Sequence, residues 1–207
     1  MFQNLPAVVC ALVESLRHDP FYVAITEDYG DIESRRFDAL SRYFDYSMSE
    51  GARSGRCVTF LDDGPAAAVW LLPRPVERTA ADARAKAAFL GAILGTKGVE
   101  NYRRIINFMT LRAQSAVKNS AWYLSIIGVS PAAQGRGIGG RVVRTTLAEA
   151  DQVVASCFLE TFSQRNLPFY QRLGFEVVAV HQEPTTRSEY YIMQRTPNNS
   201  LERPRGE

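Results

Sequence analysis

The sequence predicts one α/β (α+β) domain over residues 1–196, in which helices flank a central sheet. The apolar residues switch repeatedly between a helical period of about 3.6 and a strand period of about two, so helices and strands follow each other along the chain. Of the 207 residues 46% are hydrophobic, which is enough for a full core, and no repeat or linker divides the chain. A polar tail at 197–207, PNNSLERPRGE, is expected to be disordered.

Local patterns then justify each element in order. Apolar residues on one helical stripe predict a helix, and an Asp-Pro pair ends the first of these helices. Two apolar stretches around an Asp-Asp-Gly turn predict a hairpin, and helical spacing on both sides of a Gly-Thr-Lys-Gly break predicts a helical pair. Stretches rich in β-branched and aromatic residues predict the later strands. In chain order we expect helices at 6–17 and 33–48, strands at 56–61 and 66–72, a helical insert at 79–119 with helices at 79–94 and 99–117, a strand at 122–129, a helix at 138–154, a strand at 157–161, a helical turn at 167–173 and strands at 175–180 and 189–195.

Composition excludes several classes of partner. The chain has 24 basic and 22 acidic residues, and this even balance argues against a nucleic-acid or acidic membrane surface. No apolar run reaches the ~20 residues of a membrane span, and the N-terminus lacks the pattern of a secretory signal. We therefore expect a soluble cytoplasmic protein. The cysteines and histidines are too scattered for a disulfide framework or a metal site, and the cysteines are expected to be reduced core residues: Cys10, Cys57, Cys157, His18 and His181.

The segment SPAAQGRGIGG, residues 130–140, separates a predicted strand from a predicted helix. Glycines at a helix N-terminus let an anion approach unpaired backbone N–H groups, so we expect a pyrophosphate here, with Arg136 and Arg141 at its rim. A nucleotide P-loop is excluded because no Gly-Lys-Ser/Thr follows. A dinucleotide fingerprint fits the glycine spacing but not its context, because five residues separate the strand from the glycines and too little chain follows for further βαβ units.

Two motifs carry a family resemblance. V-S-P-A-A-Q-G-R-G-I-G at 129–139 resembles the Q/R-x-x-G-x-G/A signature of the GNAT N-acetyltransferases, and N-L-P-F-Y-Q-R-L-G-F at 166–175 resembles their Asn…Tyr-x-x-x-Gly-Phe segment. Within the family, the stretch AAAVW and both motifs are most similar to the puromycin N-acetyltransferase branch. The resemblance implies a mixed, mostly antiparallel sheet that is splayed at the cofactor site. The family's first edge strand is missing or very short in this chain.

The resemblance also implies an acetyl-CoA site and an enzymatic activity, transfer of acetyl to a primary amine in a ternary complex. The cofactor would lie where the strands 122–129 and 157–161 separate, with its pantetheine arm on main-chain groups of Ile127 and Val129. Asn166, which is also expected to cap the following helix, would touch the same arm. The cofactor-binding residues expected are Ile127, Val129, Gln134, Gly135, Arg136, Gly137, Ile138, Gly139, Gly140 and Asn166.

Two side chains are candidates for the chemistry. Tyr170 holds the tyrosine position of the second motif and is the candidate general acid, donating a proton to the leaving CoA thiolate, although an aromatic ring packed between helix and strand would explain it structurally. Alternation along the strand places Glu160 on the opposite face from Cys157, as a candidate general base for the amine. A structural ion pair or binding of the amine by its charge explains Glu160 equally well.

The acceptor pocket is expected to come from the first fifty residues and the helical insert. Aromatic residues at helical spacing are usually core, but beside acidic residues they also suit a cationic amine, such as an aminonucleoside or a related antibiotic. A protein or peptide amine, or an acyl-CoA-binding module without catalysis, stays open, as does the choice between monomer and homodimer. The acceptor residues expected are Tyr22, Tyr29, Tyr43, Trp122 and Tyr123.

Overall fold

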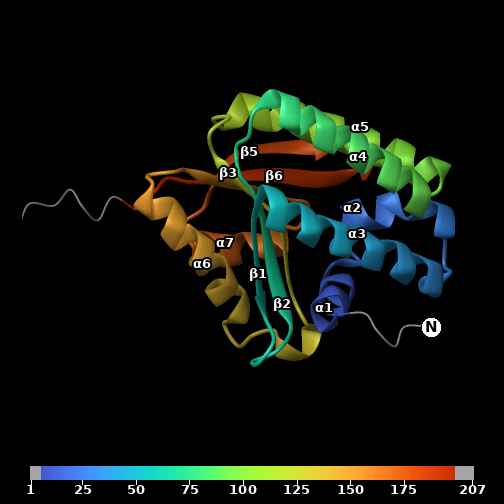
Figure 1. The fold of residues 1–207 in the computed structure, drawn as a ribbon, viewed down its shortest axis with the longest axis horizontal. Helices are drawn as coiled ribbons and strands as arrows, with labels where there is room; N and C mark the ends of the chain where they lie inside the picture. The colour runs from blue at the N-terminus through green and yellow to red at the C-terminus, as the bar shows by residue number, and fades with distance from the viewer. Residues whose placement is uncertain (1–5, 199–207) are drawn as a thin grey trace, which may run out of the picture.

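The computed structural model describes residues 6–198, and in it helices surround one six-stranded sheet (Figure 1). The strands, in their order across the sheet, are β1 (Gly55–Phe60), β2 (Ala66–Leu71), β3 (Trp122–Val129), β4 (Cys157–Thr161), β6 (Ser188–Arg195) and β5 (Glu176–Glu183). Every neighbouring pair is antiparallel except β3 and β4, which run parallel. The predicted mixed, mostly antiparallel sheet is therefore confirmed.

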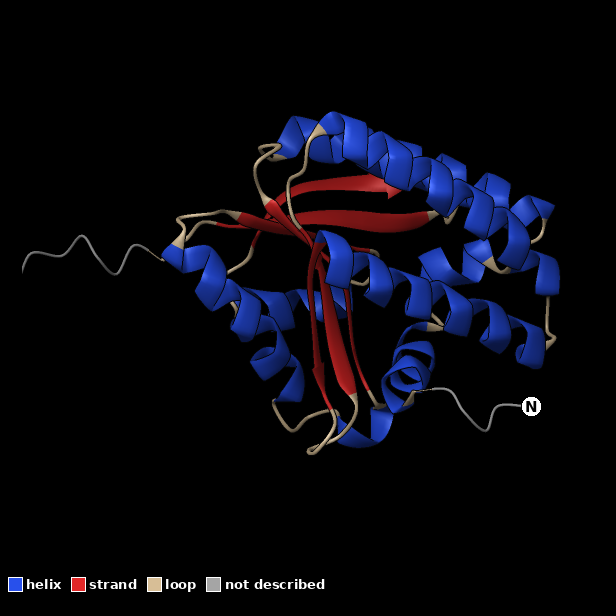
Figure 2. Cartoon of the chain, viewed as in Figure 1, coloured by secondary structure: helices blue, strands red, loops and turns tan. Residues whose placement is uncertain are grey.

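The sheet opens between its two central strands. β3 and β4 pair over only three residues each, from Trp122 opposite Cys157 to Leu124 opposite Leu159. Beyond that point β3 continues along β2, whereas β4 continues along β6, so the two halves of the sheet separate. Figure 2 shows β5 and β6 running across the direction of β1 and β2. The edge of β3 that faces β4 consequently lacks a strand partner along 125–129.

Seven α-helices occur within residues 6–198. They are α1 (Ala7–Leu16), α2 (Pro20–Ile25), α3 (Glu33–Ser54), α4 (Val76–Ile93), α5 (Thr96–Ala116), α6 (Ile138–Gln152) and α7 (Leu167–Gln171), with short 3-10 turns at 27–29, 131–133 and 164–166. None of these helices is both long enough and apolar enough to cross a membrane.

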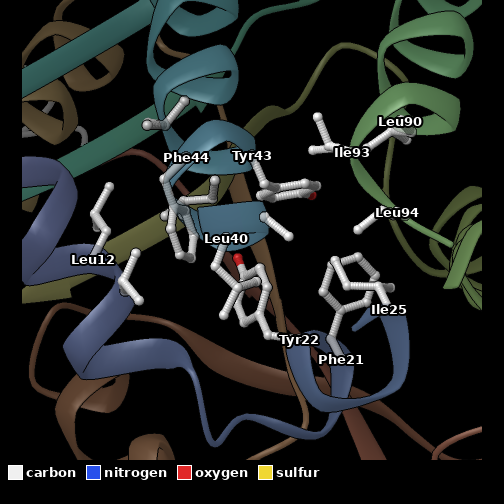
Figure 3. Close-up of a cluster of buried hydrophobic side chains, with 14 of the residues drawn as sticks. Leu12, Phe21, Tyr22, Ile25, Leu40, Tyr43, Phe44, Leu90, Ile93 and Leu94 are labelled. Atoms are coloured by element: carbon white, nitrogen blue, oxygen red, sulfur yellow. The ribbon is translucent and has the colours of Figure 1, made fainter. Parts of the chain in front are cut away.

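Alternation along β2 divides the core between the two faces of the sheet. Ala67 and Val69 face α1 and α3, whereas Ala68 and Trp70 face α6. On the first face, side chains from α1, α2, α3 and α4 meet in one cluster (Figure 3). Burial of each large apolar side chain there contributes about 1.5–3 kcal/mol. This cluster fixes α2 and α3 beside the opening of the sheet.

The chain start differs from the prediction in one helix. The Asp19-Pro20 pair does follow the end of α1, but it also begins α2, which was not predicted. Asp19 is the N-cap, since its carboxylate accepts a hydrogen bond from the Phe21 amide at 2.9 Å, and proline suits the first helical position because its missing N–H needs no partner there. Residues 199–207 of the predicted disordered tail lie outside the described part of the chain.

Candidate active site

The glycine segment forms a cleft at the start of α6. Gly137 is the N-cap of α6 in the left-handed region, with φ 77°, and Gly135 has the same φ. A Cβ atom added to either glycine would meet no atom within 4 Å, so the backbone here borders open space. The cleft has a volume of about 450 Å³. Unpaired N–H groups at a helix N-terminus that face such a space can bind an anion.

Most of the predicted cofactor residues line this glycine cleft. Those that do are Ile127, Val129, Gln134, Gly135, Gly137, Ile138, Gly139, Gly140 and Asn166, joined by Ser15, Leu16, Phe169, Tyr170 and Arg172. Arg136 is exposed and does not line it. Arg141 forms an ion pair with Asp63 in the hairpin turn. This ion pair lowers the pKa of Asp63, and the charge of Arg136 lowers it a little further.

The cleft offers groups that suit an elongated ligand with a negatively charged diphosphate. The α6 N-terminus and the Arg172 side chain supply positive charge, and the glycines keep side-chain atoms away from it. The unpaired edge of β3 offers main-chain groups to an extended arm, as a strand would. Gln134 closes the turn after β3 by donating its side-chain amide to the Val129 carbonyl at 3.1 Å.

A second cavity, the acceptor cavity, adjoins the glycine cleft. It has a volume of about 350 Å³ and includes residues of α2, α3, α5, β3 and β4. The two cavities share Leu16, Ile127, Asn166 and Tyr170. A molecule in the glycine cleft and a molecule in the acceptor cavity would therefore meet at Tyr170.

The predicted acceptor residues divide into two groups. Tyr22, Tyr43 and Tyr123 line the acceptor cavity. Tyr29 and Trp122 do not: the Tyr29 hydroxyl donates to the Ile93 carbonyl at 2.6 Å, and Trp122 packs in the core cluster beneath α6. These two positions join elements of the fold and are not brought to the cavity.

Tyr170 lies at the junction with its ring packed and its hydroxyl unpaired. Its side chain is 7% exposed, and its ring contacts those of Phe169 and Phe175 edge to face. No described residue forms a hydrogen bond with the hydroxyl, although both cavities reach this side chain. Burial raises the pKa of Tyr170, and the nearby Asp19 charge raises it further. The phenol is therefore protonated at neutral pH and has a proton to donate.

Glu160 also lines the acceptor cavity, where neighbouring phenols interact with its carboxylate. The hydroxyls of Tyr190 and Tyr123 both donate to this carboxylate. Burial raises the pKa of Glu160, and the two hydrogen bonds oppose that rise. As predicted from the alternation of β4, Glu160 points away from the buried side chains of Cys157 and Leu159.

Asp19 is a carboxylate that sequence reasoning did not select. It lines the acceptor cavity, one carboxylate oxygen accepts from the Phe21 amide, and no described residue bonds the other oxygen. Burial raises the Asp19 pKa to about 6 despite that hydrogen bond, which lowers it. Its charge in turn raises the pKa values of Tyr22 and Tyr170. The Asp-Pro sequence was interpreted only as a helix stop, whereas it is also an N-cap signal.

Two further predictions can be compared with the structure. Asn166 precedes α7, but its side chain makes no cap hydrogen bond, so the capping prediction was wrong; the side chain borders both cavities instead. All three cysteines are free. Burial raises the pKa of Cys157 to about 12, so its thiol stays protonated, as expected for a core residue and not for a nucleophile. Within residues 6–198 no cluster of His, Cys, Asp and Glu could hold a metal ion.

A glycine pair in this chain provides a direct test of the cleft. We expect Gly137→Ala to weaken acetyl-CoA binding at least about tenfold, because the new methyl group occupies space reserved for the pyrophosphate. Gly30→Ala is the control away from the cleft, since Gly30 also has a positive φ, 49°, and open space around its Cβ position, but lines none of the cavities. Gly137→Ala should lose about 1 kcal/mol of stability in the left-handed region, and Gly30→Ala should lose more, because its ψ of −130° lies outside that region.

Calorimetric titration and thermal unfolding of the two variants measure these effects. Equal acetyl-CoA affinities for Gly137→Ala and Gly30→Ala would show that the cofactor binds elsewhere. Tight binding of NADH and none of CoA by the unaltered protein would restore the dinucleotide alternative.

Comparison with known proteins gives a family match over the central part of the chain. Residues 95–177, less than half of the chain, match the family described as an acetyltransferase (GNAT) domain. This segment contains the glycines at the start of α6, Glu160 and Tyr170.

Solved structures extend the likeness to nearly the whole chain. A Corynebacterium glutamicum protein described as a histone acetyltransferase and related acetyltransferase superposes with a TM-score of 0.60 at 20% identity, covering 100% of this chain and 96% of its own. Arylalkylamine N-acetyltransferase 2 of Aedes aegypti has a TM-score of 0.59 at 12% identity, with 93% and 94% covered. The polyamine N-acetyltransferase of Drosophila melanogaster, which forms N-acetylagmatine, has a TM-score of 0.57 at 14% identity, with 92% and 93% covered. At these identities the likeness shows that the chain has the GNAT fold.

Proposed function

We propose that this protein transfers the acetyl group of acetyl-CoA to a primary amine of a small molecule. One observation carries the proposal: a cleft suited to a diphosphate and a separate aromatic cavity meet at Tyr170, whose hydroxyl is unpaired. The GNAT domain match supports the activity. Two of the proteins with the same fold are described as acting on an arylalkylamine or on agmatine, which supports a small amine as acceptor.

The chain would bind the donor through its backbone more than through its side chains. Acetyl-CoA supplies the thioester whose acetyl group is transferred. The α6 N-terminus from Gln134 to Gly140 holds its pyrophosphate, and the open edge of β3 at Ile127 and Val129 holds its pantetheine arm, with Asn166 beside it. A main-chain N–H near Val129 polarises the thioester carbonyl.

Tyr170 acts as the general acid in this proposal. As the C–N bond forms and the C–S bond breaks, its phenol gives a proton to the departing sulfur. An ammonium acceptor loses two protons overall: one restores the Tyr170 phenol, and the other leaves to solvent. The transfer needs no nucleophile from the protein, which agrees with the buried, protonated state of Cys157.

Asp19 is better placed than Glu160 to receive the protons of the amine. The Tyr190 hydroxyl already donates to one oxygen of Glu160, and the Tyr123 hydroxyl also stabilises its charged form, so this carboxylate is less available to an ammonium. Asp19 has one oxygen without a partner among the described residues, and its charge acts directly on Tyr170. A carboxylate with a pKa of about 6 is mostly ionised at pH 7. Because this pKa lies near the working pH, the carboxylate can also accept a proton during the reaction. Glu160 then orients Tyr123 in the cavity wall and the buried Tyr190 behind it.

The acceptor cavity supports a cationic amine with an aromatic or apolar body. Tyrosine and phenylalanine rings dominate its lining, including Phe21, Tyr22 and Tyr43 from α2 and α3. Aromatic faces and a carboxylate together attract an ammonium group. This chemistry agrees with the aminonucleoside or antibiotic-like acceptor that the aromatic and acidic residues of the sequence suggest.

A thiol-release assay with acetyl-CoA tests the proposal. We expect free CoA to form with small amines that carry an aromatic or apolar body, in a panel that also includes puromycin, aminoglycosides, polyamines and an N-terminal peptide. Release with the peptide alone would replace a small acceptor with a protein. Binding of acetyl-CoA without release for any amine would leave a non-catalytic acyl-CoA-binding module.

A further inference from the structure

We infer that the acceptor is an extended primary amine whose apolar tail occupies a third cavity between α3, α4 and α5. We call this space the tail chamber. The inference rests on the proposed function and names the acceptor's chemistry: an amine at one end, a polar linker, and an apolar or aromatic group at the other.

The tail chamber adjoins the acceptor cavity and shares part of its wall. It has a volume of about 310 Å³ and shares Leu71, Lys86, Tyr102 and Ile106 with that cavity. Tyr170 and Glu160 line the acceptor cavity but not the chamber. The four shared residues therefore lie between the chamber and Tyr170. A molecule with its amine beside Tyr170 could thus extend past Lys86 into the chamber.

The walls of the chamber are chiefly apolar. Beyond the shared residues they include Leu72, Ala83, Ala87, Leu90 and Val99. Ligand pockets commonly measure about 300–1,000 Å³, so each space alone holds only a small ligand. An amine confined to the acceptor cavity would leave the apolar chamber to water, at the cost of its hydrophobic contribution.

Charges at the chamber select against a second ammonium group. Glu50 forms an ion pair with Lys86 at 2.7 Å, and both side chains are mostly buried. Asp82 forms an ion pair with Arg74. Each acid that the described residues contribute to the chamber thus already has a cationic partner, and a polyamine would find no free carboxylate there.

The junction between the two spaces suits a polar linker. Lys86 has three N–H donors and gives one to Glu50, and it lines both spaces. Burial of the ion pair is costly unless further hydrogen bonds complete it. An amide, ether or hydroxyl group in the middle of the acceptor would complete them.

A series of phenylalkylamines tests the inference, starting with benzylamine and increasing in chain length. For each amine, turnover is measured with acetyl-CoA, and binding is measured by calorimetry without acetyl-CoA. In the unaltered protein we expect kcat/KM to rise about fourfold per methylene once the ring enters the chamber, as transfer of a CH₂ group from water predicts. Ala87 lines the chamber, so the larger side chain of Ala87→Trp should narrow it and abolish that rise while leaving benzylamine unchanged. Ala88→Trp is the control, since Ala88 is exposed on the same helix and lines neither space.

The outcomes separate this inference from the function on which it rests. Benzylamine turnover with no gain from longer chains, or the same gain in Ala87→Trp as in Ala88→Trp, would overturn the tail chamber and keep the acetyltransferase. Longer amines should bind more tightly to the unaltered protein and to Ala88→Trp, but not to Ala87→Trp. This result supports the chamber even if no amine is acetylated. Faster acetylation of a polyamine than of any phenylalkylamine would also overturn it.

Discussion

Replacing Tyr170 with phenylalanine lowers kcat by about 10²- to 10⁴-fold, the usual contribution of general acid catalysis. The ring remains packed against Phe169 and Phe175, so the fold and the KM for acetyl-CoA should change little. Single-turnover kinetics measure the effect, because slow product release cannot hide chemistry there. Tyr46→Phe is the matched control, since Tyr46 stacks on Phe89 and lines none of the three cavities.

A wild-type single-turnover rate for Tyr170→Phe would contradict the acid role. Tyr170 would then be a packing residue at the junction of the two cavities. A raised KM for acetyl-CoA with unchanged kcat would instead give it a role in binding only.

Asp19→Asn should lower kcat/KM at neutral pH by a similar factor, about 10²- to 10⁴-fold. Asparagine still caps α2 by accepting from the Phe21 amide, so the helix is retained. In the unaltered enzyme kcat/KM should fall as the pH drops below about 6, where Asp19 becomes protonated. In the variant that limb should disappear, and activity should increase with pH as more acceptor arrives as neutral amine.

The groups that face Asp19 are the phenols of Tyr22 and Tyr170, while Glu160 and Lys86 line the same cavity. Glu160→Gln is therefore the comparison for the pH profile. If Glu160→Gln loses the acid limb and Asp19→Asn keeps it, Glu160 is the base. Loss of the limb in Asp19→Asn alone supports the assignment to Asp19.

Asp19 also has a predictable effect on stability. Its pKa in the folded protein, about 6, lies above the ordinary value of 3.8, so between these pH values the folded state binds more protons than the unfolded state. The free energy of unfolding from this group therefore falls as pH rises through that window. Asp19→Asn removes the dependence and should unfold at the same or a higher temperature than the unaltered protein at pH 7. A marked loss of thermal stability would indicate a structural role.

The parts of the fold that depend on short patterns could be predicted from the sequence. The hairpin, the strands β3 and β4 and the glycine segment before α6 each carry their own period or turn chemistry, and they lie where expected. The splayed sheet followed from the family resemblance, since no local pattern indicates where two strands stop pairing. α2 was missed because Asp19-Pro20 ends one helix and begins the next.

The acceptor side of the site depends on tertiary packing. Tyr29 and Trp122 have the same aromatic character as Tyr22 and Tyr123, and only the packing of α2, α5 and β3 decides which rings reach the cavity. The position of Asp19 near Tyr170, with one carboxylate oxygen unpaired, likewise becomes visible only in the folded chain. Residue type therefore identified the chemistry, whereas position in space selected the residues.

The most direct measurement of acetyl transfer follows the acetyl group itself. Acetyl-CoA with an isotopically labelled acetyl group is incubated with the protein and a phenylalkylamine, and the products are analysed by mass spectrometry. The account predicts a labelled N-acetyl amide that forms with the unaltered protein and with Tyr46→Phe, and far more slowly with Tyr170→Phe. Labelled acetate in place of the amide, or an amide that forms equally fast with Tyr170→Phe, would contradict it.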